Sequence, residues 1–261
     1  MLLVSDVGNT ETTIGLADGD RIAHHWRVIT ATSRTPHEYA LLLRSLLDLA
    51  GVAHARISGA ALGSVVPAVT APLVEGIQHA FGVATLIVDA MAGLPITLDV
   101  EEPNTVGADR VINTLAASRL YGRDCIVVDL GTATTYDCIT ADGVFLGGVI
   151  APGVLTSLET LTRRTSKLPA TELRTPQHVI GRRTEECIRS GVVYGAVDAI
   201  TGIVGRIRAE WPTTRAPLVI GTGGLAAMLA PLCPILAVVD ADLTLKGLEL
   251  AHRLLTSSDA H

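Results

Sequence analysis

Short apolar runs separated by polar turns mark the start of the chain. Residues 2–5 form a largely apolar run that leads into Asp6-Val-Gly-Asn-Thr10. A second strand is predicted at residues 12–16, and an Asp18-Gly19 turn leads into a third strand at residues 21–28. Asp-Gly favours a tight turn between paired strands because glycine adopts a positive φ without strain. The pattern therefore predicts a meander of three antiparallel strands.

The same arrangement of strands and turns returns about 120 residues later. An apolar run at residues 126–128 leads into Asp129-Leu-Gly-Thr132, and a second strand is predicted at residues 134–139. An Asp142-Gly143 turn then leads into a third strand at residues 144–150. A repeat of this length indicates two related domains, because the units of a solenoid are only about 20 to 50 residues long.

A helical pattern follows each meander, and the start of the first helix is well defined. Thr35 is placed to cap it, Pro36 occupies its first position, Glu38 completes a capping box and Gly51 follows its end. Strands and helices alternate further along the chain, which predicts an α/β fold. The strands are expected at residues 60–65, 85–89, 218–220 and 235–239, and the helices near residue 152 and at residues 108–120, 184–207 and 245–255.

The repeat places the junction between the two domains near residue 118. No linker rich in proline, serine or charge marks this point. We therefore expect domains at residues 1–118 and 119–261 that share an extended cleft. The last helix is expected to pack back on the first domain.

The composition favours a globular protein that acts on small molecules. Hydrophobic residues make up 48% of the chain and charged residues 18%, so burial of apolar surface can offset the entropy lost on folding. The net charge of -6 gives no general attraction to nucleic acid or to an anionic membrane. The four cysteines lie far apart without a C-x-x-C pair, which is typical of a reducing cytoplasm. We expect a cytoplasmic protein with no nucleic-acid or membrane partner.

The two Asp-x-Gly turns are the first candidate for chemistry. An aspartate at the end of a buried strand can hold a hydrated cation, and the residues after it offer N–H groups and a hydroxyl to phosphate oxygens. Such a turn can also simply close a hairpin. The presence of two copies, at Asp6 and Asp129, favours phosphate binding. The two lysines, Lys167 and Lys246, lie outside any G-K-[ST] motif, so a nucleotide would be bound without a P-loop.

A glycine-rich turn is the second candidate. Residues 221–226, Gly-Thr-Gly-Gly-Leu-Ala, follow a predicted strand and match G-x-G-x-x-A. Their glycines would let a nucleotide base or ribose approach the backbone. A dinucleotide-binding domain is less well supported because too few residues follow Ala226 to complete one. Close packing of a helix on a strand also explains the glycines.

A carboxylate and a guanidinium lie side by side at Gly107-Ala-Asp109-Arg110, where a helix is predicted to begin. The aspartate can abstract a proton from a hydroxyl while the arginine or the helix N–H groups hold an anion. The alternative is an aspartate that caps the helix beside a solvated arginine. The spacing alone favours this alternative.

Motifs distributed over almost the whole chain form a consistent set. They are D-V-G-N-T at Asp6, V-G-A-D-R at Val106, V-D-L-G-T-A-T-T at Val128, G-G-V-I-A-P-G at Gly147, K-L-P at Lys167, V-I-G-R-R-T at Val179, S-G-V-V-Y-G at Ser190, T-G-G-L-A at Thr222 and L-T-L-K-G-L at Leu243. With these motifs the chain resembles the type III pantothenate kinases. The resemblance implies the fold of the actin, hexokinase and Hsp70 superfamily, with two RNase H-like domains and ATP in the cleft. It also implies phosphorylation of pantothenate to 4'-phosphopantothenate by ATP, the first step of coenzyme A biosynthesis.

The resemblance also implies roles for single residues. Asp109 would be the catalytic base for the primary hydroxyl of pantothenate, and Thr184 would be a substrate contact supplied by the other subunit of a homodimer. Asp129 would bind a monovalent cation, potassium or ammonium, and Asp6 would lie near the magnesium ion. The pantothenate-binding set would be Val100, Gly107, Ala108, Asp109, Arg110 and Thr184. The ATP-binding set would be Asp6, Val7, Gly8, Asn9, Thr10, Glu11, Thr12, Thr13, Thr132, Gly223 and Gly224.

The chain departs from the family pattern at a few positions. Val100 stands where many members have an aromatic substrate contact, and Glu101-Glu102-Pro103 stands in place of the usual D-N-P. Glu11 and Arg183 each replace a common asparagine. These differences bear on substrate affinity, and nothing in the sequence explains two acids near an anionic substrate.

The sequence leaves two other functions open. One is a non-catalytic paralogue that acts as a transcriptional accessory or binding protein, and the other is a kinase of the same fold that acts on another small hydroxylated substrate. The presence of Asp6, Asp109, Arg110, Asp129 and Thr184 favours the enzyme. The V-G-A-D-R motif together with Thr184 favours pantothenate over a sugar or acetate.

Overall fold

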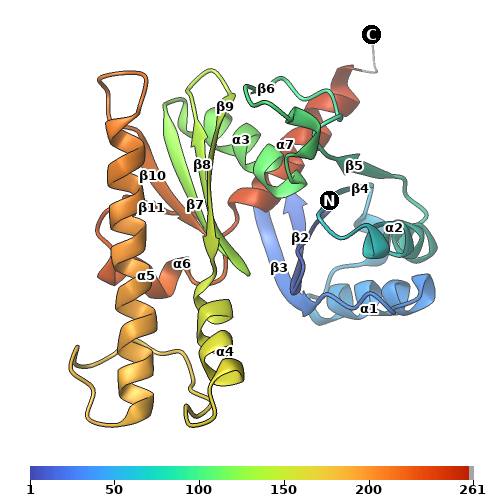
Figure 1. Cartoon of the computed structure of the whole chain (residues 1–261). Helices are drawn as coiled ribbons and strands as arrows, with labels where there is room; N and C mark the ends of the chain where they lie inside the picture. Colours follow the sequence, from blue (N-terminus) through green and yellow to red (C-terminus); the bar gives the residue numbers. More distant parts are fainter. Residues whose placement is uncertain (259–261) are drawn as a thin grey trace. The chain divides into compact units, whose positions relative to one another are not determined.

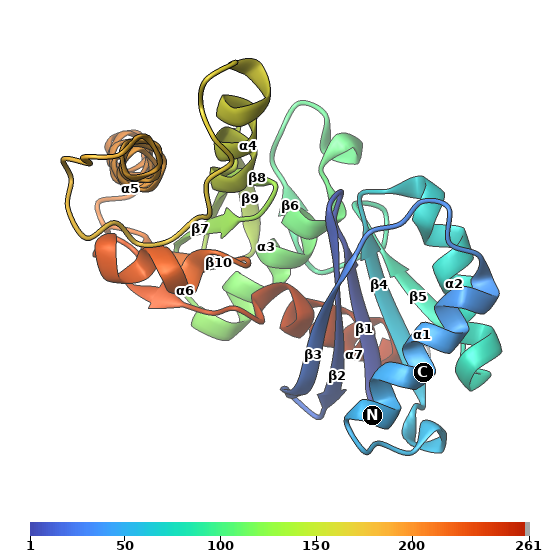
Figure 2. The ribbon, with the colours of Figure 1, turned by 90° about the horizontal axis from the view of Figure 1, so that it is seen from below.

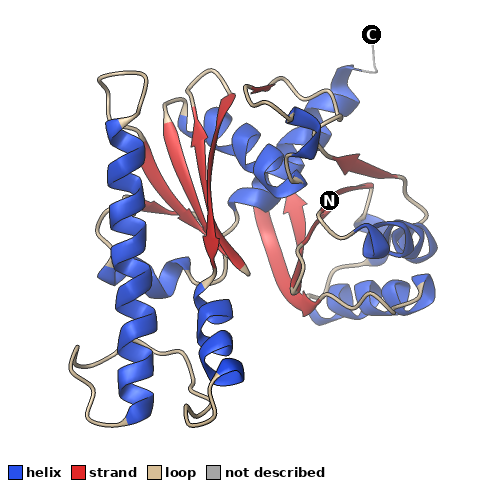
Figure 3. Cartoon of the chain, viewed as in Figure 1, coloured by secondary structure: helices blue, strands red, loops and turns tan. Residues whose placement is uncertain are grey.

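The structure is a computed structural model that describes residues 1–258. The chain forms two compact units (Figure 1). Unit 1 comprises residues 1–120 and 143–145 together with the described residues from 242 onward, and unit 2 comprises residues 121–142 and 146–241. Each unit combines a sheet with helices (Figure 3).

The sheet of unit 1 has the strand order β3-β2-β1-β4-β5. Its strands are β1 (Leu2–Val7), β2 (Glu11–Asp18), β3 (Arg21–Ile29), β4 (Gly59–Ser64) and β5 (Thr85–Val88). Neighbours among β1, β2 and β3 are antiparallel, which confirms the predicted meander. β4 lies parallel to β1, and β5 lies parallel to β4. The strands predicted at residues 60–65 and 85–89 are confirmed to within one residue at each end.

The helices of unit 1 are α1 (Pro36–Leu49), α2 (Pro67–Phe81), α3 (Ala108–Tyr121) and α7 (Leu243–Ser258). Shorter elements are 3-10 helices at His54–Arg56 and Pro103–Thr105, and β6 (Thr97–Leu98), which pairs with residues 144–145. The predicted capping box of α1 is confirmed. The N–H of Thr35 donates to the Glu38 carboxylate at 2.7 Å, and the N–H of Glu38 donates to Thr35 Oγ1 at 3.3 Å.

β1 is buried on both faces of the sheet. Successive side chains of a strand point to opposite faces, and those of β1 enter a different apolar cluster on each side. Leu3 and Val7 belong to an apolar cluster with residues of α1 and α2. Val4 belongs to a second cluster with residues of α3 and α7. Figure 2 shows α1 and α2 together on one side of the sheet of unit 1. The strand that leads to Asp6 is therefore held from both sides.

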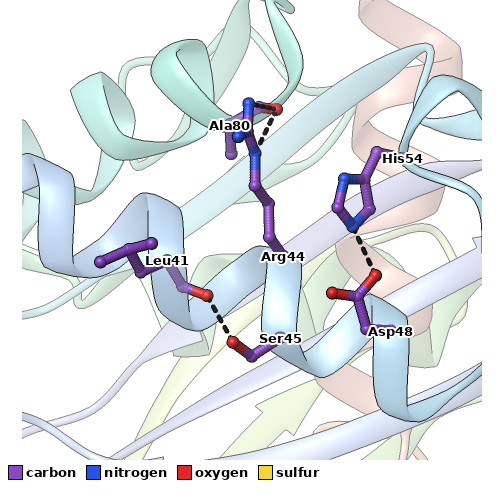
Figure 4. Close-up of polar contacts among 6 residues, drawn as sticks. All are labelled: Leu41, Arg44, Ser45, Asp48, His54 and Ala80. Atoms are coloured by element: carbon purple, nitrogen blue, oxygen red, sulfur yellow. Dashed lines mark hydrogen bonds and ion pairs between the residues drawn. The ribbon is translucent and has the colours of Figure 1, made fainter.

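α1 and α2 pack closely because α2 carries a glycine at the contact. A Cβ at Gly76 would lie 2.6 Å from Tyr39 Cβ and 2.9 Å from the carbonyl oxygen of Pro36. The guanidinium of Arg44 donates to the carbonyl oxygen of Ala80 from two nitrogens, at 2.9 and 3.1 Å (Figure 4). This contact ties α1 to the end of α2.

Helix α2 is not among the elements predicted from the sequence. Pro67 at its first position and Gly82 after its end, with φ of 70°, are ordinary start and stop signals. Pro72 lies inside the helix, where a proline normally argues against helix. Five buried residues of α2 pack against the sheet and α1, and this tertiary contact outweighs the local preference; they are Val69, Leu73, Gly76, Ile77 and Ala80.

The sheet of unit 2 has the strand order β11-β10-β7-β8-β9. Its strands are β7 (Cys125–Leu130), β8 (Ala133–Ile139), β9 (Val144–Pro152), β10 (Leu218–Thr222) and β11 (Val238–Val239). β7 and β8 are antiparallel, whereas β10 is parallel to β7 and to β11. The strand expected at residues 235–239 is wrong over its first residues. Leu236 is buried in the core, and its N–H donates to the Cys233 carbonyl oxygen in a turn at 3.0 Å.

The helices of unit 2 are α4 (Val154–Arg164), α5 (Thr184–Ala209) and the short α6 (Ala226–Leu229), followed by a 3-10 helix at Ala230–Leu232. α5 is the one helix among the described residues that is long and apolar enough to cross a membrane. Its buried residues pack into the apolar cluster of unit 2, and they include Ile188, Val193 and Ile200. This packing accounts for the apolar residues on the buried side of α5.

The tight contact of α2 with α1 leads to a prediction for stability. We expect Gly76→Ala to lower the free energy of unfolding by about 1 to 3 kcal/mol, because the added methyl group meets the Pro36 backbone and forces a shift. Gly205→Ala on α5 is the matched control, since a Cβ at Gly205 meets nothing within 4 Å. It should raise stability by about 0.5 to 1 kcal/mol. Urea denaturation measures both, and equal effects of the two substitutions would contradict the packing argument.

Candidate functional site

Asp6 lies at the end of β1, on the face of the sheet that α3 covers. β1 pairs Asp6 with Thr13 of β2 and with Gly63 of β4, and directly paired residues point to the same face of a sheet. A Cβ at Gly63 would collide with the side chain of Ile112 in α3 and would lie 3.8 Å from Ala108 Cβ. Asp6 therefore points to the side of the sheet on which α3 begins.

The turn that follows Asp6 is narrow and polar. The N–H of Gly8 donates to the Glu11 carbonyl oxygen at 3.1 Å. A Cβ at Gly8 would lie 2.9 Å from that same oxygen, so glycine suits this position. Asn9 and Thr10 are exposed, whereas Thr12 is buried. Exposed backbone and short polar side chains are typical of a phosphate-binding loop.

Asp109 lies in the first turn of α3 and is half-buried. Burial raises the pKa of its carboxyl, and the Arg110 N–H that donates to Asp109 Oδ1 at 2.9 Å offsets only part of this effect. A Cβ at Gly107 would lie 2.6 Å from the same oxygen, so glycine leaves room for the carboxylate. A carboxylate with a raised pKa is suited to accept a proton.

The alternative interpretation, a capping aspartate beside a solvated arginine, is only partly supported. The carboxylate of Asp109 does accept an N–H at the start of the helix, as a capping residue would. Asp109 is, however, inside α3, and Arg110 is not a solvated arginine. The guanidinium carbon of Arg110 lies 5.0 Å from the centre of the buried Phe145 ring. This cation–π contact holds Arg110 in place beside Asp109.

The other members of the predicted substrate set differ in exposure: Ala108 is buried and Gly107 is half-buried. Val100 is half-buried, and Glu101 and Glu102 are exposed ahead of the 3-10 helix. Thr184 is exposed as the first residue of α5 in unit 2. Glu186 secures this helix start by accepting the N–H groups of residues 182 and 183 at 2.8 and 3.3 Å. A contact of Thr184 with Asp109 stays a prediction.

Unit 2 brings together two motifs that lie far apart in the sequence. β7 and β10 pair Asp129 with Thr222. A Cβ at Gly223 would collide with Asp129 Oδ1 and would lie 2.7 Å from the Leu130 nitrogen. Gly223 has φ of 84°, a conformation that favours glycine. The glycine turn after β10 therefore packs directly on the Asp129 carboxylate, and Gly224 beside it is exposed.

The turn that follows Asp129 is also narrow, and it touches the start of α4. The N–H of Gly131 donates to the Ala133 carbonyl oxygen at 3.1 Å. A Cβ at Gly153 would collide with the Thr132 carbonyl oxygen and would lie 2.5 Å from that of Gly131. The glycine of the G-G-V-I-A-P-G motif thus lets α4 begin against this turn. Thr132 itself is exposed.

Two threonines that the sequence analysis did not single out also contact these turns. Thr30 follows β3, and its hydroxyl donates to the Gly8 carbonyl oxygen at 2.7 Å. Thr156 in α4 donates to the Thr132 carbonyl oxygen at 2.7 Å. Both come shortly after the third strand of a meander. This shared position is visible in the sequence, but it does not show that either hydroxyl contacts a turn.

The residues present fit a nucleotide with its metal ion. Within residues 1–258, no group of three or more His, Cys, Asp or Glu side chains is arranged to hold a metal ion. Magnesium bound with a nucleotide needs only one or two protein carboxylates, because phosphates and waters supply its other ligands. Asp6, beside the narrow turn of Gly8, meets this requirement.

A family model described as type III pantothenate kinase matches residues 2–206. The chain belongs to the type III pantothenate kinase family. It is 41% identical to the type III pantothenate kinase of Halalkalibacterium halodurans, with 97% of this chain and 99% of the relative covered. It is 43% identical to that of Thermomicrobium roseum, with 97% and 96% covered. The resemblance inferred from the motifs is thereby confirmed.

Solved structures agree on the fold. A protein from Campylobacter jejuni described as a Baf family transcriptional activator aligns with a TM-score of 0.60 at 17% identity, covering 98% of this chain and 99% of that one. A protein from Listeria monocytogenes described as an N-acetylmannosamine kinase aligns with a TM-score of 0.51 at 12% identity, covering 99% of each chain. At such identities the likeness concerns the fold alone. The predicted α/β fold is confirmed, and it is the fold of these two solved proteins.

The raised pKa of Asp109 leads to a prediction for stability. Because the folded state holds the Asp109 proton more tightly than the unfolded state does, the group lowers stability as pH rises through the ordinary aspartate range and beyond. We expect Asp109→Asn, which keeps the acceptor for the Arg110 N–H, to unfold at a higher temperature than the unmodified protein at pH 8. The difference should vanish near pH 2, well below the ordinary aspartate pKa of about 3.9, where both states are protonated. Thermal unfolding at the two pH values measures it, and a lower melting temperature of the variant at pH 8 would contradict the argument.

Proposed function

We propose that this protein transfers the terminal phosphoryl group of ATP to the primary hydroxyl of pantothenate, the first step of coenzyme A biosynthesis. The observation that carries the proposal is the desolvated carboxylate of Asp109, which lies at the start of α3 on the side of the sheet to which Asp6 points. A proton acceptor and a phosphate-binding turn are the groups that such a transfer requires. Family membership supports pantothenate as the acceptor.

In the proposed reaction Asp109 accepts the proton of the pantothenate hydroxyl. The hydroxyl oxygen forms a bond to the γ-phosphorus, the bond from that phosphorus to the bridging oxygen breaks, and ADP leaves with the electron pair. The raised pKa of Asp109 makes it a better proton acceptor than an ordinary aspartate. Arg110, held over Phe145, binds the pantothenate carboxylate, and Gly107 and Ala108 contact the substrate through the start of α3. Val100 completes the substrate set.

The phosphates of ATP are proposed to bind the turn from Asp6 to Thr13, with Thr132 as a further contact. Gly223 and Gly224 would contact the nucleoside. Magnesium, held near Asp6, neutralises charge on the phosphates when bound. A potassium or ammonium ion is proposed at Asp129, whose carboxylate the Gly223 turn holds at the end of β7.

We further propose a homodimer in which Thr184 of one subunit contacts the substrate bound near Asp109 of the other. Thr184 is exposed at the start of α5. On the same helix a Cβ at Gly191 or at Gly195 would meet nothing within 4 Å, and both line a pocket of about 650 Å³. An open helix face of this kind can accommodate a second copy of the chain. The proposed location is the cytoplasm, where both substrates are available.

One alternative is a non-catalytic paralogue that acts as a transcriptional accessory protein. The likeness to the Campylobacter jejuni protein has only 17% identity and concerns the fold. A paralogue without activity has no need of a desolvated carboxylate, which lowers stability. The environment of Asp109 therefore favours the enzyme.

The reaction itself is the first test. Purified protein with magnesium and potassium should release ADP with pantothenate and not with a panel of sugars or acetate. Asp109→Asn should lower turnover by about two to four orders of magnitude, the usual contribution of a general base. Binding of ATP should be unchanged. Absence of pantothenate-dependent ADP under every cation condition would overturn the proposal, and a loss of only a few-fold in the variant would leave Asp109 as a capping residue.

The cation site leads to a separate prediction. Activity should rise with potassium or ammonium and not with sodium, because the Asp129 carboxylate would hold a weakly hydrated ion whose charge would offset that of the phosphates. Asp129→Ala should lower activity and flatten this response. ADP release measured across chloride salts of the three cations at constant ionic strength provides the test, and equal rates in sodium and potassium would contradict the assignment.

The shared site predicts complementation between two inactive chains. Co-expression of an Asp109→Asn chain with a Thr184→Arg chain gives mixed dimers in which one site carries both defects and the other carries neither. Random pairing of equal amounts should restore roughly a quarter of the sites. Native mass spectrometry confirms the mixed dimers. If they form and activity does not return, each chain builds its own site.

A further inference from the structure

Thr30 is bonded twice to the turn that follows Asp6. Its hydroxyl donates to the Gly8 carbonyl oxygen at 2.7 Å, and its N–H donates to the Thr10 carbonyl oxygen at 3.0 Å. The hydroxyl also lies 2.9 Å from that of Thr12, which is buried. Thr30 thus holds two carbonyl groups of a five-residue motif from outside it.

Thr156 makes the corresponding contact in unit 2. It lies in the first turn of α4, and its hydroxyl donates to the Thr132 carbonyl oxygen at 2.7 Å. Gly153, just before the helix, lets the backbone of α4 approach that same oxygen. The carbonyl group of Thr132 is therefore held at the start of a helix.

The two contacts share one design. In each unit the third strand of the meander ends, and the segment directly after it supplies a threonine hydroxyl to a carbonyl of the turn between the first two strands. Each turn is closed by a glycine N–H, from Gly8 to the Glu11 carbonyl and from Gly131 to the Ala133 carbonyl, both at 3.1 Å. The arrangement recurs although the two turns differ in length by a residue.

A hydrogen bond that holds a carbonyl group also fixes the orientation of the N–H group in the same peptide unit. The peptide unit is planar and trans, so the direction of the Gly8 carbonyl sets the opposite direction for the N–H of Asn9. The Thr132 carbonyl does the same for the N–H of Ala133. Backbone N–H groups of this kind bind phosphate oxygens when they converge, and a turn that must first be ordered loses affinity to the entropy of ordering.

We propose that Thr30 and Thr156 are positioning residues that hold the two turns in the conformation that binds the phosphates of ATP. The inference rests on the proposed function for the identity of the ligand. Neither threonine touches the reacting atoms, and each acts through the peptide group that it holds. Serine at either position keeps the hydroxyl donor, whereas valine keeps the shape of threonine and lacks the hydroxyl.

The experiment compares Thr30→Val and Thr156→Val with Thr30→Ser and Thr156→Ser. Each valine variant should raise KM for ATP about three- to tenfold, which corresponds to the loss of one hydrogen bond. KM for pantothenate should stay within about twofold, and the serine variants should remain close to the unmodified protein. Alanine at both positions replaces valine if a valine variant does not fold.

Two further threonines serve as matched controls. Thr160 lies one turn further along α4 and donates to the Thr156 carbonyl oxygen at 2.7 Å, and Thr256 on α7 donates to the His252 carbonyl oxygen at 2.8 Å. Both are exposed. Thr160→Val and Thr256→Val each remove a hydroxyl that donates to a carbonyl of its own helix and not to a carbonyl of either turn, so they should leave KM for ATP unchanged.

Calorimetric binding of the ATP analogue with nitrogen between the β- and γ-phosphorus, in the presence of magnesium, provides a readout without turnover. The valine variants should bind it three- to tenfold more weakly. If the unmodified protein binds the analogue but forms no ADP with pantothenate, the proposed function fails while this comparison still tests the inference. Unchanged binding in the valine variants, equal losses with serine and valine, or no binding by the unmodified protein would each overturn the positioning role.

Discussion

The side chain of Ile112 lies where α3, β4 and α7 meet, and the place of the candidate base depends on that contact. A Cβ at Gly63 of β4 would collide with Ile112, and a Cβ at Gly247 of α7 would lie 2.5 Å from Ile112 Cγ2. Both neighbours are glycine where they touch it, so the Ile112 side chain packs directly on the backbone of β4 and of α7. Asp109 is three residues earlier on the same helix. A larger residue at either glycine would push α3 outward and move the carboxylate away from the end of β1.

Two candidate carboxylates, one in each unit, lie in crowded surroundings. Asp109 has its carboxylate against Gly107, and Asp129 has its carboxylate against Gly223, in each case at a point where a methyl group would not fit. Burial raises the pKa of Asp109, which is unfavourable for folding at neutral pH and favourable for proton transfer. Residues that lower stability are retained where a reaction requires them. Because each contact residue is a glycine, the backbone can approach each of these carboxylates closely.

Local patterns were sufficient for much of the fold. The two meanders, the capping box at Thr35 and most strands and helices follow from residues that are near neighbours in the chain, and they were predicted correctly. Helix α2 was missed because Pro72 argues against a helix, and only burial against α1 and the sheet outweighs it. The strand at residues 235–239 was too long because apolar character alone does not separate a strand from the buried turn at Leu236. The division of the domains at residue 118 and the contact of Thr184 across a dimer stay predictions.

The candidate site, like the fold, could be predicted from the sequence only in part. The candidate reactive groups, Asp6, Asp109 and Asp129, were predicted from motifs, and a motif is a pattern of consecutive residues. The desolvation of Asp109, the contact of Gly223 with Asp129 and the threonine that holds each turn could not be read in this way. They arise between segments separated by tens of residues, and no local pattern records which atoms meet there. Consecutive residues thus define which chemistry the protein carries, whereas packing between distant segments decides where each carbonyl and carboxylate points.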